Sequence, residues 1–310
     1  MKEQDVFHAG ERIIQERTGE VKMAQTNSRI IQEEIVPGAF NFLERQAMVV
    51  LSTQDKHGKV WVSVLMGAPG FVKVPDSKVV TIDLRSVATP PQDIALTNLA
   101  NTGQVGMLFI ELATRRRIRI NGTASHEGDL LTVQVQEAYP NCPKYIQRRV
   151  LHSDTGTTRH GMKLELGTRF SLGNISLIRQ ADTMFVGSVA QTGYLDASHR
   201  GGPRGFVEVL DDKTLKIPDY KGNSMFNTLG NFVEDARAGL IFLDFDRGEM
   251  LQLTGRAKLL FDQFGAQDMN RTTGTGRYWL FHLEEWMSTQ ATLPFRWEYV
   301  DASPLNPDMA

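Results

Sequence analysis

The sequence predicts a mainly β protein with flanking short helices, built from two tandem copies of one small β-rich domain. Three observations support this prediction. The chain has 310 residues, a length typical of about two domains. Short runs of apolar and β-branched residues recur between polar turns. Finally, segments of the first half recur in the same order in the second half.

The sequence of the first half predicts short helices followed by strands. Residues 8–17 and 37–46 have helical spacing of apolar residues, and the second segment begins with a proline. A further helical stretch, interrupted by two prolines, is expected over residues 131–150, and the polar segment 152–161 is the best linker candidate. Strands are expected at residues 47–53, 60–66, 70–74, 79–84, 105–112 and 117–124.

An internal repeat sets the domain organisation. Residues 63–82 align without a gap with residues 198–217, and the shared residues include a Gly-Phe-Val segment. Two further matches follow in the same order, residues 105–111 with 238–244 and 118–124 with 251–257. Three collinear matches favour duplication over chance similarity of apolar strands. We therefore expect one domain over residues 1–155 and another over residues 162–300. A small closed antiparallel barrel and a β-sandwich both fit each copy.

Composition excludes several classes of protein. The formal net charge is -2, so no global basic field is available for nucleic acid or an anionic membrane. Cys142 is the only cysteine, which excludes an intrachain disulfide, and no Cys/His cluster has the spacing of a zinc site. No secretory signal and no apolar run of membrane-spanning length is present. We expect a cytoplasmic protein with no metal site.

The two copies differ where a binding site would lie. His199 and Arg200 of the second copy replace Val64 and Leu65 of the first. The segment Lys221–Ser224 then combines a cation, a glycine and two residue types that favour helix N-termini, before a helix expected over residues 225–236. An ordinary helix cap is the alternative interpretation. An anion site is favoured because the segment directly follows a strand and its counterpart, residues 86–91, has lost every one of these elements.

These segments resemble a known family. Residues 197–209, 216–232, 238–245 and 251–260 together resemble the pyridoxamine 5'-phosphate oxidase-related, FMN-binding split-barrel superfamily, and in particular its two-barrel branch. The resemblance implies two tandem split β-barrels of the FMN-binding type. It also implies a degenerate site in the first barrel and an FMN site in the second.

The resemblance implies a role for individual residues of the second copy. Phe206 and Val207 would run beside the isoalloxazine ring. The strand end Pro218-Asp219-Tyr220 would lie near the ribityl chain and the ring edge. Lys221, Asn223 and Ser224 would receive the phosphate, with Arg200 or Arg204 nearby, and Gln252 would lie on a strand that supplies a side chain to the flavin.

The first copy would supply the other wall of the cleft. Arg115, Arg117 and Arg119 share one strand face by alternation, and Arg119 is the repeat equivalent of Gln252. We expect Arg117 and Arg119 to line the flavin or substrate cleft. A solvated, charged strand face is the alternative.

These features predict an FMN-binding flavoprotein, an oxidoreductase acting on a small molecule with NAD(P)H or oxygen as co-substrate. A non-catalytic flavin or haem binder, serving as carrier or sensor, is the alternative, and an interaction protein that has lost its ligand is a third. Nothing after Trp279 matches the Arg-x-His substrate clamp of true pyridoxamine 5'-phosphate oxidases, so vitamin B6 synthesis is not expected. The barrels would pair within one chain or in a homodimer.

Overall fold

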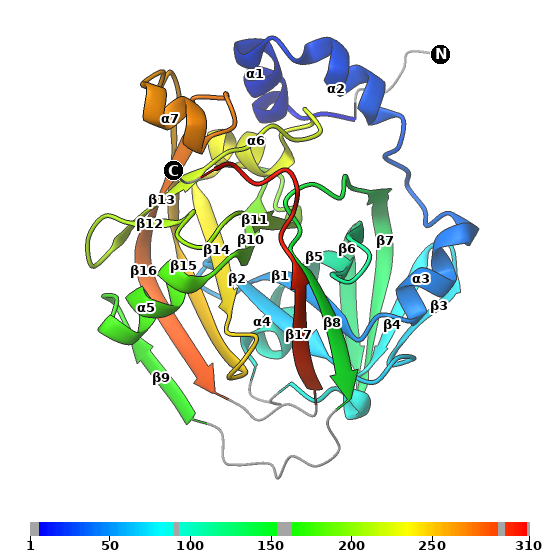
Figure 1. The fold of residues 1–310 in the computed structure, drawn as a ribbon. Helices are drawn as coiled ribbons and strands as arrows, with labels where there is room; N and C mark the ends of the chain where they lie inside the picture. Colours follow the sequence, from blue (N-terminus) through cyan, green and yellow to red (C-terminus); the bar gives the residue numbers. More distant parts are fainter. Residues whose placement is uncertain (1–5, 90–92, 154–162, 291–294, 309–310) are drawn as a thin grey trace.

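The computed structural model describes residues 6–89, 93–153, 163–290 and 295–308 (Figure 1). Two large antiparallel sheets, one from each half of the chain, lie side by side with short helices around them. The mainly β class is therefore confirmed. The helices are α1 (Ala9–Thr18), α2 (Val21–Ser28), α3 (Phe40–Glu44), α4 (Ile94–Thr102), α5 (Leu172–Gln180), α6 (Asn227–Glu234) and α7 (Ala266–Arg271), with 3-10 turns η1 (Pro37–Ala39) and η2 (Leu84–Ser86).

The first sheet has the strand order β2-β1-β5-β6-β7-β4-β3. Its strands are β1 (Met48–Gln54), β2 (Val60–Met66), β3 (Val72–Asp76), β4 (Val79–Asp83), β5 (Gln104–Glu111), β6 (Arg116–Glu127) and β7 (Leu130–Pro140). The apolar residues that alternate along these strands form one core cluster, and α3 packs Phe42 and Leu43 against it.

The second sheet repeats this order as β11-β10-β14-β15-β16-β13-β12, with β9 added to β16. Its strands are β9 (Lys163–Gly167), β10 (Thr183–Val189), β11 (Leu195–Gly201), β12 (Glu208–Val209), β13 (Thr214–Pro218), β14 (Arg237–Leu243), β15 (Glu249–Leu260) and β16 (Tyr278–Gln290). An identical path in both halves is what a duplication predicts.

One detail of the repeat is a matched β-bulge. The register shifts between Asn121 and Gly122 in the first sheet and between Thr254 and Gly255 in the second. A Cβ on either glycine would lie 2.1 Å from a carbonyl oxygen of the facing strand. Only glycine therefore fits at this bend of each long strand.

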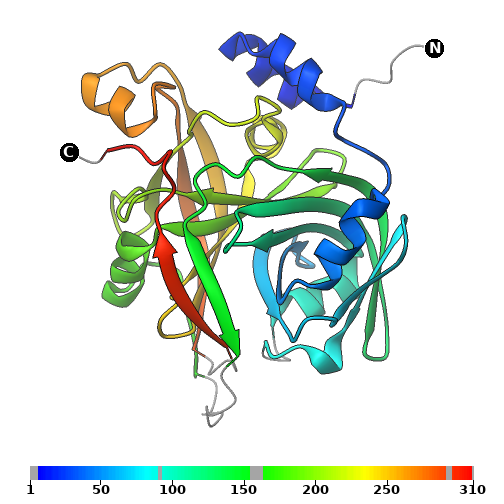
Figure 2. The same ribbon diagram turned by 45° about the vertical axis from the view of Figure 1, so that its right-hand side comes forward.

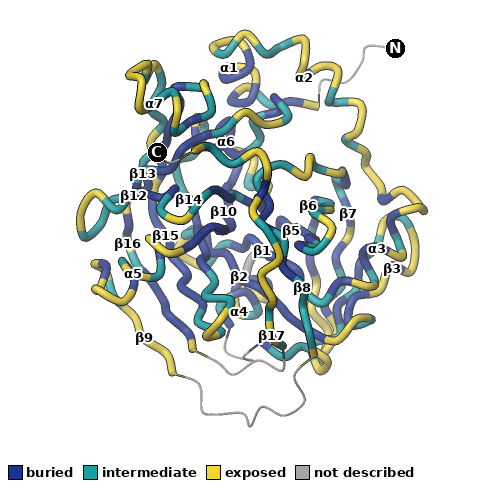
Figure 3. The backbone as a smooth tube through the Cα atoms, viewed as in Figure 1, coloured by how far each residue is buried: buried dark blue, intermediate teal, exposed yellow. Residues whose placement is uncertain are grey.

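A small third sheet joins the two halves. It pairs β8 (Arg148–Ser153) with β17 (Phe295–Asp301), so the end of the first half is held by the end of the second (Figure 2). Side chains from β8 and β17 pack on a third apolar cluster, which lies between the two large sheets and includes Val62, Phe185 and Ile241. Buried residues follow the strands of both large sheets, whereas β9 is mostly exposed (Figure 3).

The junction between the sheets follows the repeat. Gln252 on β15 donates to Val62 O at 2.8 Å and to Ser63 Oγ at 2.9 Å. Its repeat equivalent Arg119 on β6 donates to Ala197 O at 2.9 Å and to Ser198 Oγ, the equivalents of those two residues. The two halves thus face each other through the same pair of strands with their roles exchanged.

Two structural predictions were wrong. Residues 131–150 form β7 and β8 instead of a helix, because Leu131, Val133 and Val135 alternate into the core with the period of a strand. The barrels are also not closed, since β2 and β3 end the first strand path, and β11 and β12 the second, among the described residues. The helix expected over residues 225–236 is confirmed as α6, which begins at Asn227.

Among the residues described, no helix combines the length and apolar character that crossing a bilayer requires.

Candidate functional site

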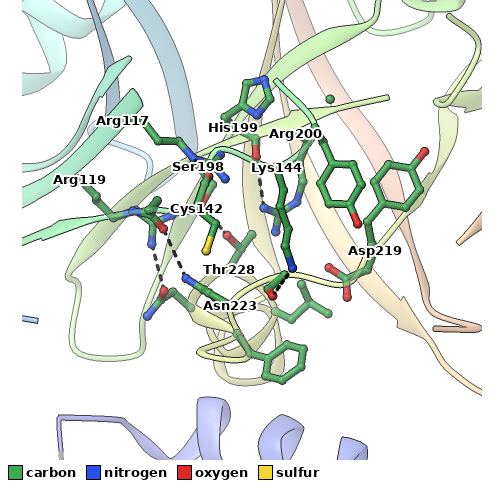
Figure 4. A pocket seen from close by; sticks show the side chains of 18 of the residues that line it. Arg117, Arg119, Cys142, Lys144, Ser198, His199, Arg200, Asp219, Asn223 and Thr228 are labelled. Carbon is green, nitrogen blue, oxygen red and sulfur yellow. Dashed lines mark hydrogen bonds between the residues drawn. The ribbon is translucent and has the colours of Figure 1, made fainter. Parts of the chain in front are cut away.

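A cavity of about 100 Å³ lies between the two halves of the chain (Figure 4). The first half contributes β6 and the segment 141–145, and the second contributes β11 and the segment 219–229. Arg117 and Arg119 reach it from β6, while Ser198 and Arg200 reach it from β11. Alternation on each strand places both members of a pair on the same face.

Arg119 is the best-anchored cation at this cavity. Its side chain is 6% exposed and its Nε lies 2.8 Å from Asp196 Oδ1. Nη1 donates to Tyr139 Oη at 2.9 Å and to Asn227 Oδ1 at 3.1 Å. These contacts join three segments of the chain around a single guanidinium group, and they use most of its donors.

Arg117 and Arg200 are much less neutralised. Arg117 Nε donates to Cys142 O at 2.9 Å, and Arg200 Nη1 donates to His199 O at 3.4 Å. No carboxylate of the described chain forms an ion pair with either of them. Burial, followed by the charges of Arg119 and Arg200, lowers the pKa of Arg117 to about 9. Burial likewise lowers the pKa of Arg200. The cavity therefore holds positive charge that the protein leaves unbalanced.

The nearest carboxylate in the cavity wall is engaged elsewhere. Asp219 Oδ2 accepts from Arg277 Nε at 2.9 Å, and the Asp219 amide donates to Arg277 O at 3.0 Å. Asp219 thus pairs directly with Arg277, and it acts on Arg200 only through its charge at longer range, which does not offset the effect of burial.

Four polar atoms of the residues around the cavity are buried without a partner in the described part of the chain: Arg200 Nε, Tyr220 Oη, Asn141 Nδ2 and His199 Nε2. Such atoms are costly unless something hydrogen-bonds to them. The rings of Tyr145 and Tyr220 lie 4.7 Å apart at one side of the cavity, so an aromatic surface adjoins the polar one. The arrangement suits a ligand with both an anionic group and a flat ring.

Residues 36–148 match a family model described as pyridoxamine 5'-phosphate oxidase. The resemblance to the pyridoxamine 5'-phosphate oxidase-related family is confirmed. Solved structures similar to parts of this chain include HupZ of Group A Streptococcus (17% identity, 37% of this chain and 90% of that chain, TM-score 0.31). Others are a FAD-binding protein of Mesorhizobium loti (11%, 43% and 99%, 0.30) and the general stress protein 26 of Bacillus anthracis (8%, 41% and 95%, 0.26). No curated protein matches the chain.

The cavity brings together several residues that the family resemblance or the alternation along a strand predicted. They come from both halves of the chain, as the hypothesis of a two-walled cleft requires. They are Arg117, Arg119, Arg200, Asp219, Tyr220, Asn223 and Ser224. Arg115 does not join them, because it lies in the turn before β6 and pairs with Asp301.

Other implied residues lie away from the cavity. Phe206 and Val207 are 4% and 1% exposed and belong to the core of the second sheet. The side-chain amide of Gln252 donates to β2 at the junction between the sheets and does not line the cavity. Arg204 lines a different cavity, of about 350 Å³, beside α5 and the β14–β15 turn. Pro218 ends β13 and does not line the cavity.

Lys221 is exposed and does not line the cavity; only its carbonyl oxygen faces the segment 141–145. Lys144 of that segment points across instead, with its Nζ 3.4 Å from Lys221 O and 3.3 Å from Gly222 O (Figure 4). Asn223 and Ser224 do not cap α6, because the N-cap is Phe226 and makes no side-chain cap bond.

Some cavity residues were not anticipated as a site. Asn141, Cys142, Lys144 and Tyr145 contribute to its wall, and their only sequence signal was the resemblance of this segment to the same family. His199, in contrast, points away from the cavity and packs edge-on against Phe185 at 5.7 Å (Figure 4). Burial holds the pKa of His199 well below its usual range, so this imidazole is neutral.

Proposed function

We propose that this chain is an FMN-binding flavoprotein whose cofactor lies in the cavity between its two halves. The observation that carries the proposal is the unbalanced positive charge of Arg117 and Arg200, one from each half. A phosphate would neutralise both guanidinium groups through charge-assisted hydrogen bonds. The family match over residues 36–148 supports a flavin as the bearer of that phosphate.

The residues present fit such a cofactor. Arg117 and Arg200 would hold the phosphate, with Asn223 beside it, and Arg200 Nε would gain the partner that it lacks. Tyr145 and Tyr220 would lie against the ring system, where Tyr220 Oη also lacks a partner. A bound flavin supplies the electron-transfer chemistry itself, so the protein need only bind, orient and give access.

The cavity must widen before it can hold the whole flavin. About 100 Å³ is less than the roughly 300–1,000 Å³ of pockets that hold small-molecule ligands. Lys144 and Tyr145 both contact the carbonyl of Lys221 and so bridge the mouth of the cavity. We infer that this bridge opens when the ring enters.

As an enzyme, the protein would transfer electrons between a small molecule and NAD(P)H or oxygen. The test begins with the visible spectrum of the purified chain and a titration of the colourless form with FMN. Binding of one FMN per chain, with bleaching by NADH or NADPH, is the expected result. Flavin that binds but never turns over would leave a carrier or sensor, and a Soret band would point to haem. A chain that binds no flavin contradicts the proposal.

A further inference from the structure

The segment 223–227 has a costly backbone conformation at the cavity wall. Ser224 and Phe226 both have a φ of 64°, in the left-handed region that residues other than glycine avoid. Such conformations persist only where the surrounding structure imposes them. Asn223, Ser224 and Phe226 all line the cavity, so whatever imposes this conformation also shapes the site.

Helices α1 and α2 supply the contacts that impose it. Helix α1 packs on α6, and α2 follows α1 along the same edge of the molecule (Figures 1 and 2). Their side chains bind the backbone or side chains of successive residues in the segment. The hydrogen bonds run from Asn27 Nδ2 to Asn223 O (2.6 Å), from Ser224 Oγ to Glu20 Oε2 (2.5 Å), from Gln15 Nε2 to Met225 O (3.1 Å) and from Asn227 Nδ2 to Glu11 Oε1 (2.5 Å).

Glu20 has a second connection to the cavity. Its Oε1 lies 3.3 Å from Arg277 Nη1, and Arg277 in turn holds Asp219 through its Nε. The Arg277 guanidinium also lies 5.1 Å from the ring centre of Phe226. One carboxylate between α1 and α2 therefore fixes two separate parts of the cavity wall, at Ser224 and at Asp219.

We propose that α1 and α2 form a strap that presets the cavity for its ligand, and that Glu20 is a positioning residue for the phosphate-bearing flavin of the proposed function, on which this inference rests. Ligand binding and strap docking then favour the same conformation of the segment 223–227. Each event must strengthen the other, because coupling between two sites is reciprocal. The alternative is that α1 and α2 only pack against the chain. They would then raise its stability without changing its affinity for FMN.

The test compares FMN dissociation constants of three variants, measured by quenching of flavin fluorescence. Glu20→Ala removes both connections and is expected to weaken FMN binding about tenfold, the effect of one lost charge-assisted hydrogen bond. Glu20→Gln keeps an acceptor for Ser224 but loses the charge beside Arg277, so a smaller loss is expected. Glu16→Gln is the matched control, since Glu16 is an exposed carboxylate of the neighbouring helix α1, and no change is expected there.

Amide hydrogen exchange provides a readout that does not depend on flavin. In the free chain, Glu20→Ala is expected to speed exchange of residues 223–228, while the strands of both large sheets keep their protection. In the wild type, FMN is expected to slow exchange of α1 and α2, although these helices do not line the cavity.

The outcomes separate the two proposals. Failure of the wild type to bind FMN contradicts the proposed function, and the exchange of the free chain then still decides whether the strap orders the segment. Equal FMN affinity of Glu20→Ala and the wild type, with faster exchange of residues 223–228, would overturn the coupling. Unchanged exchange in Glu20→Ala would overturn the strap itself.

Discussion

Arg117 and Arg119 lie two residues apart on β6 and line the same cavity, yet their surroundings differ. Arg119 faces the carboxylate of Asp196, whereas Arg117 has no carboxylate partner among the described residues. A buried cation with a partner holds the structure together, and one without a partner is a cost that a ligand can remove. Substitution of each residue should therefore affect different properties.

The variant Arg117→Met is expected to weaken FMN binding without lowering the stability of the chain. The variant keeps the length of the side chain and removes its charge, so FMN affinity should fall by about tenfold or more, as for loss of a charge-assisted hydrogen bond. The melting temperature should stay the same or rise, because the lowered pKa of Arg117 shows that its charge is disfavoured in the folded chain. Isothermal titration and thermal denaturation check the two parts. A large loss of stability with unchanged affinity would contradict this assignment.

At Arg119 the same change is expected to reduce stability strongly. It would leave Asp196 buried and unpaired, which typically costs about 3–5 kcal/mol in the free energy of unfolding. Urea denaturation of Arg119→Met measures the loss, and Asp196→Asn in the same background should recover part of it. The arginine is also expected to shape the cleft, so an Arg119→Ala chain with unaltered FMN content and turnover would refute that role.

A buried carboxyl group of helix α1 is expected to make the stability of the chain depend on pH. Glu11 lies at the contact of α1 with α6, is 3% exposed, and has its pKa raised by burial from 4.5 to about 7. The charged groups that face it are His8, Glu137 and, through Asn227, Arg119; His8 also contacts Glu234. The folded chain therefore holds a proton on Glu11 that the unfolded chain releases near pH 4.5.

Stability should consequently fall as the pH rises from about 4.5 through 7. The full contribution is present below pH 4.5, and the loss reaches about 3 kcal/mol above pH 7, from 1.36 kcal/mol per pKa unit. Glu11→Gln should flatten this part of the profile and be more stable than the wild type at pH 8. Denaturation curves between pH 4 and 8 provide the measurement. Identical slopes for both chains would show that Glu11 titrates normally.

Elements whose residues alternate or repeat could be predicted from the sequence. The strand from Val60 to Met66 has the predicted bounds, and the two sheets follow the same strand path, as a duplication requires. The helix predicted over residues 131–150 was wrong because two prolines were interpreted as breaks in a helix. Pro140 instead ends β7, and the alternating Leu131 and Val133 belong to that strand. The conformation predicted for Lys221–Ser224 was wrong in detail for another reason. Its conformation depends on α1 and α2, about two hundred residues away in the chain, and no local pattern records that contact.

At the scale of the whole molecule, the repeat should produce two equivalent clefts, and among the described residues the cations gather at one of the two places. The equivalents of Arg117 and Arg119 are Met250 and Gln252, both buried, and Met250 packs in the apolar cluster between the sheets. In the first half, Thr89 lies against β2 and accepts from the amide of Met66 at 2.9 Å. The comparison of the two copies could predict this asymmetry, because Leu65 of the first copy stands where the second copy has Arg200. It could not predict that Gln252 would hold the junction.

We propose that the chain divides into domains over residues 1–155 and 162–300, and that neither is stable alone. Each half hides the apolar cluster between the sheets, and strand β8 of the first half pairs only with β17 of the second among the described strands. Expressed separately as residues 1–155 and 162–310, the halves should aggregate or unfold, because a large apolar surface would be exposed. Expressed together, they should associate one to one and bind one FMN per pair.

Size-exclusion chromatography with mass measurement distinguishes the outcomes, and the junction offers a matched pair of variants. A Cβ on Gly106 would lie 2.7 Å from the backbone of Asp196 across the junction, so Gly106→Val should prevent association of the co-expressed halves. Gly38→Ala, where no atom lies within 4 Å of the added Cβ, should not. A first half that is monomeric and unfolds cooperatively by itself would show that the two barrels are independent, and that the cleft between them forms by docking of finished domains instead of by shared folding.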